Sequence, residues 1–346
     1  MITYVVVFLA ALAFALGATP VARKVAVSAG MVDRPDPRKL HARAMPLLGG
    51  VVIYAACVLA VLVFGDRQYV SQLVGILLGA TLVSFLGIWD DRWGMRPLLK
   101  LAGQVAAAAI IVGSGIQIEF LRIPWLNVAL TVLWIVGITN AINLLDNMDG
   151  LSGGVAAIAS GFLFLLAVGS GQFLVASLAA ATVGACLGFL RYNFNPASIF
   201  MGDTGSLFLG FLLSVIAIKL RFDNLDLITW MVPVLVLGVP IFDTTLVVVS
   251  RLRKGLNPLS TPGKDHVSHR LVSLGLTQRE SVMAMYLTCG ALGMTAMFVS
   301  RATVLEGIMV GSLAFIGGVF ALMKLERVAS ATGSGGAKPG GAIDVN

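Results

Sequence analysis

Charged side chains are scarce in this chain: they make up 12% of its 346 residues, while 58% are hydrophobic and the mean hydropathy is +0.94. A soluble domain carries roughly a quarter charged residues, so this composition excludes an ordinary soluble protein. Cysteine is also rare. Cys57, Cys186 and Cys289 stand singly in apolar stretches, which argues against a disulfide framework and a cysteine metal site. The composition predicts a polytopic membrane protein.

Apolar runs fill most of the chain. The first one lacks a preceding basic segment and a clear cleavage site, so we expect a retained span rather than a removed leader. A membrane-crossing helix needs about 20 apolar residues. The run 150–190 is twice as long, and VGSGQ at its centre predicts a turn between two spans. We therefore predict an all-α integral membrane protein with about eleven transmembrane helices, two of them in that long run. The other nine runs are 1–22, 44–65, 68–89, 101–118, 123–145, 204–218, 227–250, 281–300 and 307–323.

Lysine and arginine are unevenly distributed among the loops. The odd-numbered loops and the C-terminal tail hold 19 of the 24 residues of these two types. Because basic residues mark cytoplasmic loops, we expect the N-terminus outside and the C-terminus in the cytoplasm. The predicted transmembrane domain covers residues 1–328. The small, polar residues of 329–346 predict a disordered cytoplasmic tail.

Five polar clusters fall in the predicted cytoplasmic loops or at the helix ends beside them, whereas the predicted external loops are short. A transporter is expected to place polar groups near the midplane, with access from both sides. Clusters on one face instead indicate an active site at the cytoplasmic membrane surface. The clusters are VDRPDPRKLHARAMPLLGG (32–50), WDDRWGMRPLLK (89–100), NAINLLDNMDG (140–150), RYNFNPASIFMGDTGS (191–206) and TPGKDHVSHR (261–270).

Acids grouped with asparagines and glycines suit a hard cation. Mg²⁺ takes oxygen ligands, usually one or two from the protein, with water and substrate phosphates completing its shell. The alternative for any single acid is a helix cap or an ion pair with a nearby arginine. That alternative explains the whole set poorly. The candidate oxygen donors are Asp90, Asp91, Asn143, Asp146, Asp149 and Asp203.

Two of these clusters carry a specific geometric expectation. MGDTGS (201–206) should begin the eighth span, with free backbone N–H groups for a phosphate beside a metal on Asp203; an N-cap role for this acid is the alternative. If the fifth helix continues past Asn143, then Asp146 and Asp149 follow at successive turns and share one side with it.

The loop at 251–280 contains two of the three histidines, His266 and His269. A long cytoplasmic loop is basic in any case, but the histidine pair favours contact with a pyrophosphate over a zinc site, which lacks further ligands here. Asp243, in the ninth predicted span, either braces a proline-kinked helix or reaches the site.

The first loop gathers basic residues that include Lys39 and His41. They fit either a substrate or anionic lipid headgroups.

In order along residues 30–280, these motifs resemble those of the polyprenyl-phosphate N-acetylhexosamine-1-phosphate transferases of glycosyltransferase family 4. Phospho-N-acetylmuramoyl-pentapeptide transferase is a more distant relative. The resemblance implies a bacterial inner-membrane enzyme with a cytoplasmic-facing site. It implies transfer of N-acetylglucosamine 1-phosphate from a UDP-sugar to a polyprenyl phosphate, such as undecaprenyl phosphate, with release of UMP at the start of a cell-envelope polysaccharide. Mg²⁺ is the implied cofactor, with Mn²⁺ as an alternative ion. A homodimer stays open, and no nucleic-acid partner is expected.

The resemblance also implies roles for individual residues. Asn143 and Asp203 resemble the metal ligands. In the implied catalytic set, Asp90 lies nearest the lipid phosphate with Asp91 supporting it, Asp146 and Asp149 face the nucleotide or metal, and His266 and His269 hold the pyrophosphate. Lys39 and His41 would lie near the substrate entrance. The remaining implied substrate-binding residues are Asn140, Asn195, Phe200, Ser206, Lys264 and Arg270.

Two positions depart from the family pattern. The family's H-x-H-H motif is HVSH here, so Ser268 stands where a histidine is usual. In the D-G-x-D-G motif, Asn147 replaces the first glycine. Because asparagine tolerates left-handed backbone geometry best after glycine, we expect the turn to survive at Asn147.

Three rival functions are weighed against this one. A lipid or anion transporter predicts internal repeats and polar groups on both faces, which the sequence lacks. A non-catalytic scaffold leaves the acid clusters without a purpose. A muramoyl-pentapeptide donor is the nearest rival, and the HVSHRL loop, which lacks three adjacent histidines, favours the simpler hexosamine group.

Overall fold

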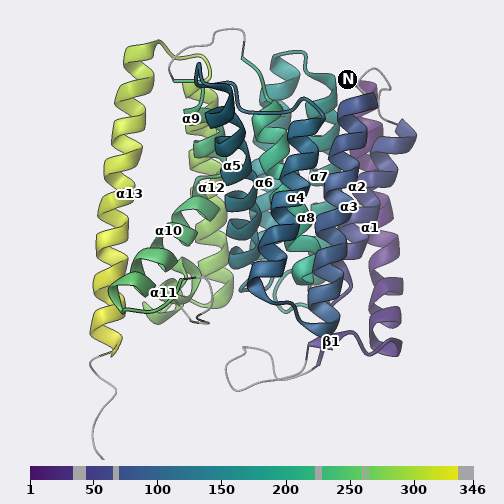
Figure 1. The fold of residues 1–346 in the computed structure, drawn as a ribbon. Helices are drawn as coiled ribbons and strands as arrows, with labels where there is room; N and C mark the ends of the chain where they lie inside the picture. The colour runs from purple at the N-terminus through teal and green to yellow at the C-terminus, as the bar shows by residue number, and fades with distance from the viewer. Residues whose placement is uncertain are drawn as a thin grey trace, which may run out of the picture.

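The computed structural model describes residues 1–33, 44–64, 70–222, 228–258, 261, 263 and 265–333 (Figure 1). Helices dominate this part of the chain. Its two short strands, β1 (Val32–Asp33) and β2 (Met45–Pro46), pair antiparallel with Val32 opposite Pro46. The helices are α1 (Ile2–Ser28), α2 (Gly49–Phe64), α3 (Val70–Trp93), α4 (Pro97–Gly113), α5 (Pro124–Leu145), α6 (Leu151–Gly169), α7 (Phe173–Asn193), α8 (Gly202–Lys219), α9 (Met231–Val236), α10 (Gly238–Arg253), α11 (Val267–Ser273), α12 (Gln278–Val299) and α13 (Val304–Gly333).

The helices follow the apolar runs of the sequence. Among the described residues, eight helices are long and apolar enough to cross a membrane, and α2 and α4 are shorter apolar helices. The predicted turn in the long run 150–190 lies between α6 and α7, where Gly171 adopts a φ of +65°. The fold class, an all-α multi-pass membrane protein, is confirmed. The three cysteines are buried and free, as their apolar settings predict.

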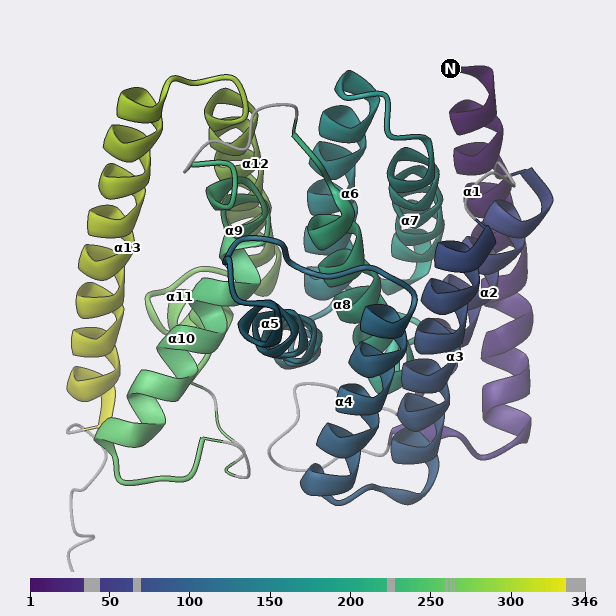
Figure 2. The ribbon, with the colours of Figure 1, turned by 45° about the horizontal axis from the view of Figure 1, so that its top comes forward.

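The predicted ninth span is wrong as a single helix. The run 227–250 contains two helices, α9 and α10, which are separated at Leu237. Pro240 explains the break, because its ring clashes with the carbonyl of the residue four positions earlier, and that residue is Val236, the last of α9. As a result α10 runs obliquely to the neighbouring helices (Figure 2).

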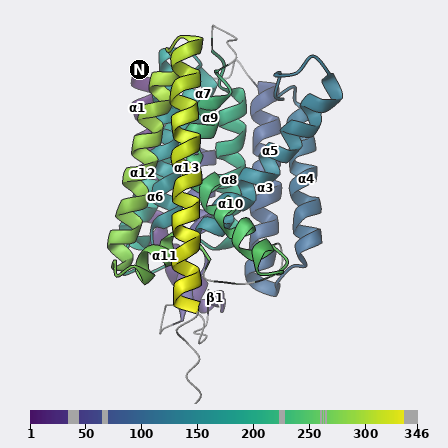
Figure 3. The same ribbon diagram turned by 90° about the vertical axis from the view of Figure 1, so that its left-hand side faces the viewer.

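Two helices form the centre of the bundle. In α7 and α8, 78% of the most apolar window is buried, compared with 0% in α13. α1 and α6 pack on α7, while α3 and α5 pack on α8. α13 stands at the edge of the bundle, as Figures 1 and 3 show. The start of α8, which carries MGDTGS, therefore lies among several other helices.

The polar elements gather at one end. The β1–β2 ribbon and α11 lie at the end of the bundle opposite the N-terminus (Figure 1). α13 also ends there and continues through Gly333. Residues 329–333, which the sequence assigned to a disordered tail, are therefore helical.

Candidate active site

The start of α8 is capped by a side chain from another helix. Asp91, near the end of α3, accepts hydrogen bonds from the backbone N–H groups of Asp203 (2.8 Å) and Thr204 (3.1 Å) and from the Thr204 hydroxyl (2.7 Å). Gly202 precedes them with a φ of +69°, and a Cβ there would lie 2.6 Å from the Asp91 carboxylate. The expectation that these N–H groups are free for a phosphate is wrong, because Asp91 already satisfies two of them.

Glycines allow the helices around this point to touch. A Cβ at Gly50 of α2 would lie 2.1 Å from the Gly205 nitrogen, and one at Gly87 of α3 would lie 2.4 Å from the Thr204 Cα. Backbone bonds reinforce the contact: Gly49 and Gly50 donate to the carbonyls of Phe200 and Met201. Phe200, a predicted substrate residue, also donates its N–H to the Pro46 carbonyl (2.8 Å).

Lys100 lies at the centre of the acidic cluster. Its ammonium group contacts Asp203 Oδ2 at 2.5 Å, Asp90 Oδ2 at 3.0 Å and Asn143 Oδ1 at 3.3 Å. Asp90 also accepts the Met95 N–H (2.7 Å) through its other oxygen. Sequence reasoning missed Lys100, because a basic residue at a cytoplasmic helix end is ordinary. Its position ten residues after Asp90, within the same motif, was the available signal.

Asn143 and Asp203, the two predicted metal ligands, lie side by side. Asn143 Nδ2 donates to Asp203 Oδ1 (2.8 Å) and to the Ser206 hydroxyl (2.9 Å). Asn143 Oδ1 and Asp203 Oδ2 both contact the Lys100 ammonium, so two protein oxygens already converge on one positive charge. This donor set fits Mg²⁺, which takes few protein ligands. Among the described residues, no group of three or more His, Cys, Asp or Glu side chains has a metal-binding arrangement.

Asp146 is the acid of the cluster to which no side chain in the described part of the chain donates a hydrogen bond. α5 ends at Leu145 and Asp146 is its C-cap, so the expected alignment of Asn143, Asp146 and Asp149 along one continued helix is wrong. Within the described residues, no hydrogen bond reaches its carboxylate. Burial, with the negative charges of Asp203, Asp91 and Asp149 nearby, raises the pKa of Asp146 to about 8.

Asp149 holds the loop between α7 and α8. It accepts hydrogen bonds from Asn195 Nδ2 (3.1 Å) and from the Ala197 N–H (2.9 Å). Asn195 also donates to Gln278 Oε1 (3.1 Å), and its carbonyl accepts from Arg279. Asp149 and Asn195 therefore hold the loop between α7 and α8 in place.

Asp243 holds one of the two histidines. His266 Nδ1 lies 2.8 Å from Asp243 Oδ2, and the Val267 N–H donates to Oδ1 at 2.7 Å. Asp243 is fully buried and His266 is 5% exposed. The ring of His269 lies 6.1 Å from that of His266, centroid to centroid. Asp243 thus reaches the helix α11, which carries both histidines.

The two residues that depart from the family pattern contact each other. The Ser268 hydroxyl donates to Asn147 Oδ1 at 2.6 Å. Asn147 does not adopt the left-handed geometry expected of it: all positive-φ residues in the described part of the chain are glycines. Gly150 supplies that geometry instead, with a φ of +77°.

The guanidinium of Arg270 is hydrogen-bonded to other groups of the protein. It is 3% exposed, and its guanidinium donates to the Leu325 carbonyl (2.7 Å), to Glu326 Oε1 (2.7 Å) and to the Asp265 carbonyl (2.9 Å). These contacts attach α11 to α13. Asn140 is likewise paired, exchanging hydrogen bonds with the buried amide of Gln104. For both residues, substrate binding stays a prediction.

Three predicted site residues, Lys39, His41 and Lys264, lie outside the described residues. Of the others, Asp90, Asp91, Asn143, Asp203 and Ser206 form one connected cluster at the start of α8. The pair His266 and His269 lies on α11, which the Ser268–Asn147 bond joins to the acidic turn at 146–150.

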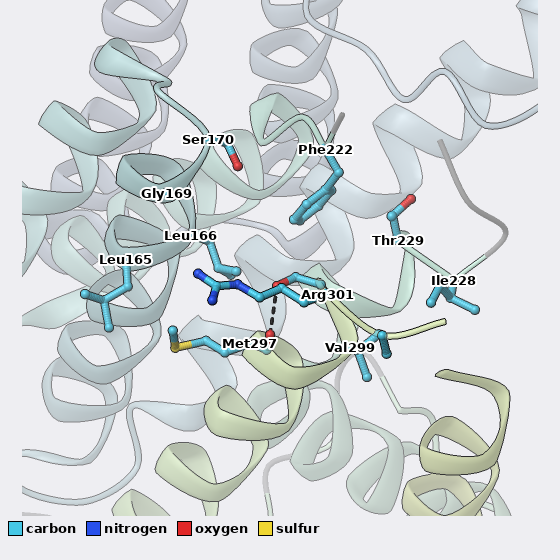
Figure 4. Close-up of a pocket in the computed structure, with 12 residues that line it drawn as sticks. Leu165, Leu166, Gly169, Ser170, Phe222, Ile228, Thr229, Met297, Val299 and Arg301 are labelled. Atoms are coloured by element: carbon cyan, nitrogen blue, oxygen red, sulfur yellow. Dashed lines mark hydrogen bonds between the residues drawn. The ribbon is translucent and has the colours of Figure 1, made fainter. Parts of the chain in front are cut away.

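A separate cavity of about 300 Å³ lies between α6, the loop before α9 and the α12–α13 connection (Figure 4). Arg301 reaches into it beside Leu166 and Met297. These elements belong to the end of the bundle that carries the N-terminus, so this cavity is distinct from the acidic cluster.

The fold and the cluster define a multi-pass membrane protein with acids, an asparagine and a lysine gathered at one end. Residues 73–221 match the model of glycosyl transferase family 4. The chain is 39% identical, over 88% of its length and 87% of the relative's, to the "Probable undecaprenyl-phosphate N-acetylglucosaminyl 1-phosphate transferase" of Bacillus subtilis (strain 168). It is 32% identical to the "Decaprenyl-phosphate N-acetylglucosaminephosphotransferase" of Mycolicibacterium smegmatis, covering 81% and 78% of the two chains. A "Phospho-N-acetylmuramoyl-pentapeptide-transferase" of Bacillus mycoides is 34% identical over 64% and 75%. The chain belongs to glycosyl transferase family 4.

Proposed function

We propose that the protein transfers N-acetylglucosamine 1-phosphate from UDP-N-acetylglucosamine to undecaprenyl or another polyprenyl phosphate and releases UMP. The similarity to the Bacillus subtilis relative supports the acceptor and the sugar, since it extends over nearly the whole of both chains. The observation that carries the chemistry is the convergence of Lys100, Asn143, Asp90 and Asp203 on one point. Opposite charges gathered there suit a reaction between two phosphate groups.

Mg²⁺, or Mn²⁺, is the proposed cofactor, held by Asp203 and Asn143. When bound, it supplies positive charge to the pyrophosphate of the donor. The protein contributes a second positive charge through Lys100, beside the same two ligands. Asp91 holds Asp203 in place through the start of α8. The carboxyl of Asp146, which accepts no hydrogen bond from the described residues, is a further acid available to the metal or the nucleotide.

The proposed chemical step is a displacement at phosphorus. A terminal oxygen of the lipid phosphate bonds to the phosphorus attached to the sugar, and the bond from that phosphorus to the bridging oxygen breaks. UMP leaves with that oxygen. The lipid phosphate is already mostly ionised near neutral pH, so the reaction does not require a strong base. Asp90 would orient the lipid phosphate, and His266 and His269 would bind the pyrophosphate oxygens. Positioning and charge neutralisation then carry most of the rate.

The proposed placement in the membrane follows the charges. We assign eleven crossings: the eight long helices, α2, α4, and α9 with α10 as one broken crossing. With the N-terminus outside, the acidic cluster, α11 and the end of α13 face the cytoplasm, where a UDP-sugar is available. This arrangement fits a bacterial inner-membrane enzyme. Polar groups concentrated at one end support an enzyme over a transporter.

The test uses purified protein with Mg²⁺, UDP-N-acetylglucosamine and undecaprenyl phosphate, and measures UMP release. Asp203→Asn should lower the rate roughly a hundredfold to a thousandfold, the scale of losing one electrostatic contact to the transition state. Glu119→Gln is the matched control, because this exposed acid pairs with Arg221 outside the cluster. Normal turnover by Asp203→Asn would overturn the metal assignment. Preference for a UDP-muramoyl-pentapeptide donor in a donor panel would overturn the sugar assignment.

A further inference from the structure

The histidine helix α11 depends on its neighbours for its position. It has seven residues, and a helix of this length is not stable alone in water. Asp243 of α10 holds its start through His266 and Val267. Arg270, near its end, is held by Glu326 of α13. Ser268 lies between these two anchors and contacts Asn147 in the acidic turn at 146–150.

The Ser268–Asn147 contact has a defined geometry. Ser268 is fully buried, and its hydroxyl donates to Asn147 Oδ1 at 2.6 Å. The same amide group donates through Nδ2 to the Leu144 carbonyl at the end of α5, at 3.0 Å. The amide is therefore fixed on both sides, and its oxygen is directed at Ser268. A continuous chain of hydrogen bonds runs from α5 through Asn147 to α11.

The residues next to this pair in the sequence are predicted site residues. Asn147 directly follows Asp146 and precedes Asp149 by two residues, while Ser268 lies between His266 and His269. One hydrogen bond thus joins the turn that carries two acids to the helix that carries two histidines. We propose that Asn147 and Ser268 are positioning residues that set the separation of these acids and histidines for the donor pyrophosphate. This inference rests on the proposed function.

The two substrates should respond differently to loss of the bond. The histidines are proposed to bind the pyrophosphate of the UDP-sugar, and Asp146 is the acid available to its nucleotide or metal, so binding of the UDP-sugar depends on the separation of these groups. The lipid phosphate is assigned to Asp90, whose ion pair with Lys100 does not involve the Ser268–Asn147 pair. Ser268→Ala removes the donor from the partly buried amide oxygen of Asn147. We expect the KM for UDP-N-acetylglucosamine to rise about fivefold to twentyfold, with kcat and the KM for the lipid changed less than twofold.

The experiment is a double-mutant cycle on the full chain with Ser268→Ala, Asn147→Ala and the double variant. Because each single variant removes the same bond, the double variant should raise the donor KM no further than the larger single effect. Ser273→Ala is the matched control. Its hydroxyl bonds to the Arg270 carbonyl within the same helix, so it should behave as the wild type. Asn147→Gly is a second way to remove the bond should an alanine variant not fold.

The outcomes are separable. Additive effects on the donor KM, equal effects on both substrates, or equal effects of Ser268→Ala and Ser273→Ala would each overturn the positioning role. Absence of UMP release by the wild type would overturn the proposed function instead. In that case the same four proteins, compared by Tm, still test the bond: coupled effects support it, and additive ones refute it.

Discussion

The His266 ring and the backbone N–H of Val267 both bond to the carboxylate of Asp243. One oxygen of Asp243 lies 2.8 Å from the ring Nδ1, and the other accepts a hydrogen bond from the Val267 N–H at 2.7 Å. Because a carboxylate accepts hydrogen bonds, this pairing places the ring proton on Nδ1 and leaves Nε2 as the nitrogen that can bind a ligand. Asp243 therefore fixes both the place of the histidine and its tautomer.

Asp243→Asn should keep the shape of the site but lose this control. An amide can present its NH₂ group to Nδ1 and thereby favour the other tautomer. We expect UMP release to fall about tenfold to a hundredfold, the scale for residues that orient a functional histidine. Thr245→Ala on the same helix is the control, because its exposed hydroxyl bonds to the Ile241 carbonyl within that helix. Equal rates for the two variants would contradict the orienting role.

Lys100 should compete with the metal as well as assist the reaction. In Lys100→Met, Asp90 and Asp203 lose the ammonium that they share. We expect a lower Tm in metal-free buffer, a larger rise of Tm on adding Mg²⁺ than in the wild type, and UMP release reduced roughly a hundredfold. Lys24→Met, which removes an exposed cation of α1, should change none of these. An unchanged Mg²⁺ response would show that Lys100 and the ion occupy different places.

Gly87 should be intolerant of any side chain. The Cβ of an alanine there would lie 2.4 Å from both the Cα and the nitrogen of Thr204, in the capped start of α8. Overpacking of this kind costs about 1–3 kcal/mol, and here it would also displace Asp203. We expect Gly87→Ala to lower the Tm and to lose most of its UMP release. Gly161→Ala on α6 has open space around its Cβ and should keep both. An active, stable Gly87→Ala would contradict the close packing of α3 on α8.

The sequence predicted those features that depend on local patterns. Apolar runs of about 20 residues predict helices because each run must satisfy its backbone within the membrane. The start of α8 at MGDTGS and the turn before α7 at VGSGQ were also predicted from short local patterns. The break before α10 was also predictable in principle, since Pro240 excludes a continuous helix.

Roles that depend on distant partners could not be predicted from single motifs. Asp91 caps a helix that begins 111 residues later in the chain, and nothing in WDDRW specifies that partner. Asp243 likewise needs the approach of α11 to show its purpose. At Asn147, a rule about backbone tolerance suggested left-handed geometry, whereas the side chain is used for hydrogen bonds.

Asp146 should make the stability of the metal-free protein depend on pH. Its pKa is raised to about 8 in the folded protein, against about 4 for an unfolded chain. The protonated form is thus favoured by folding, so this contribution is fully present below about pH 4 and is lost as the pH rises toward 8. We expect Asp146→Asn to gain in Tm relative to the wild type across this range, measured in chelator-treated detergent solution. Glu119→Gln, which removes an exposed acid elsewhere, should track the wild type. Parallel Tm curves for Asp146→Asn and the wild type would show that this carboxyl is not buried beside the other acids.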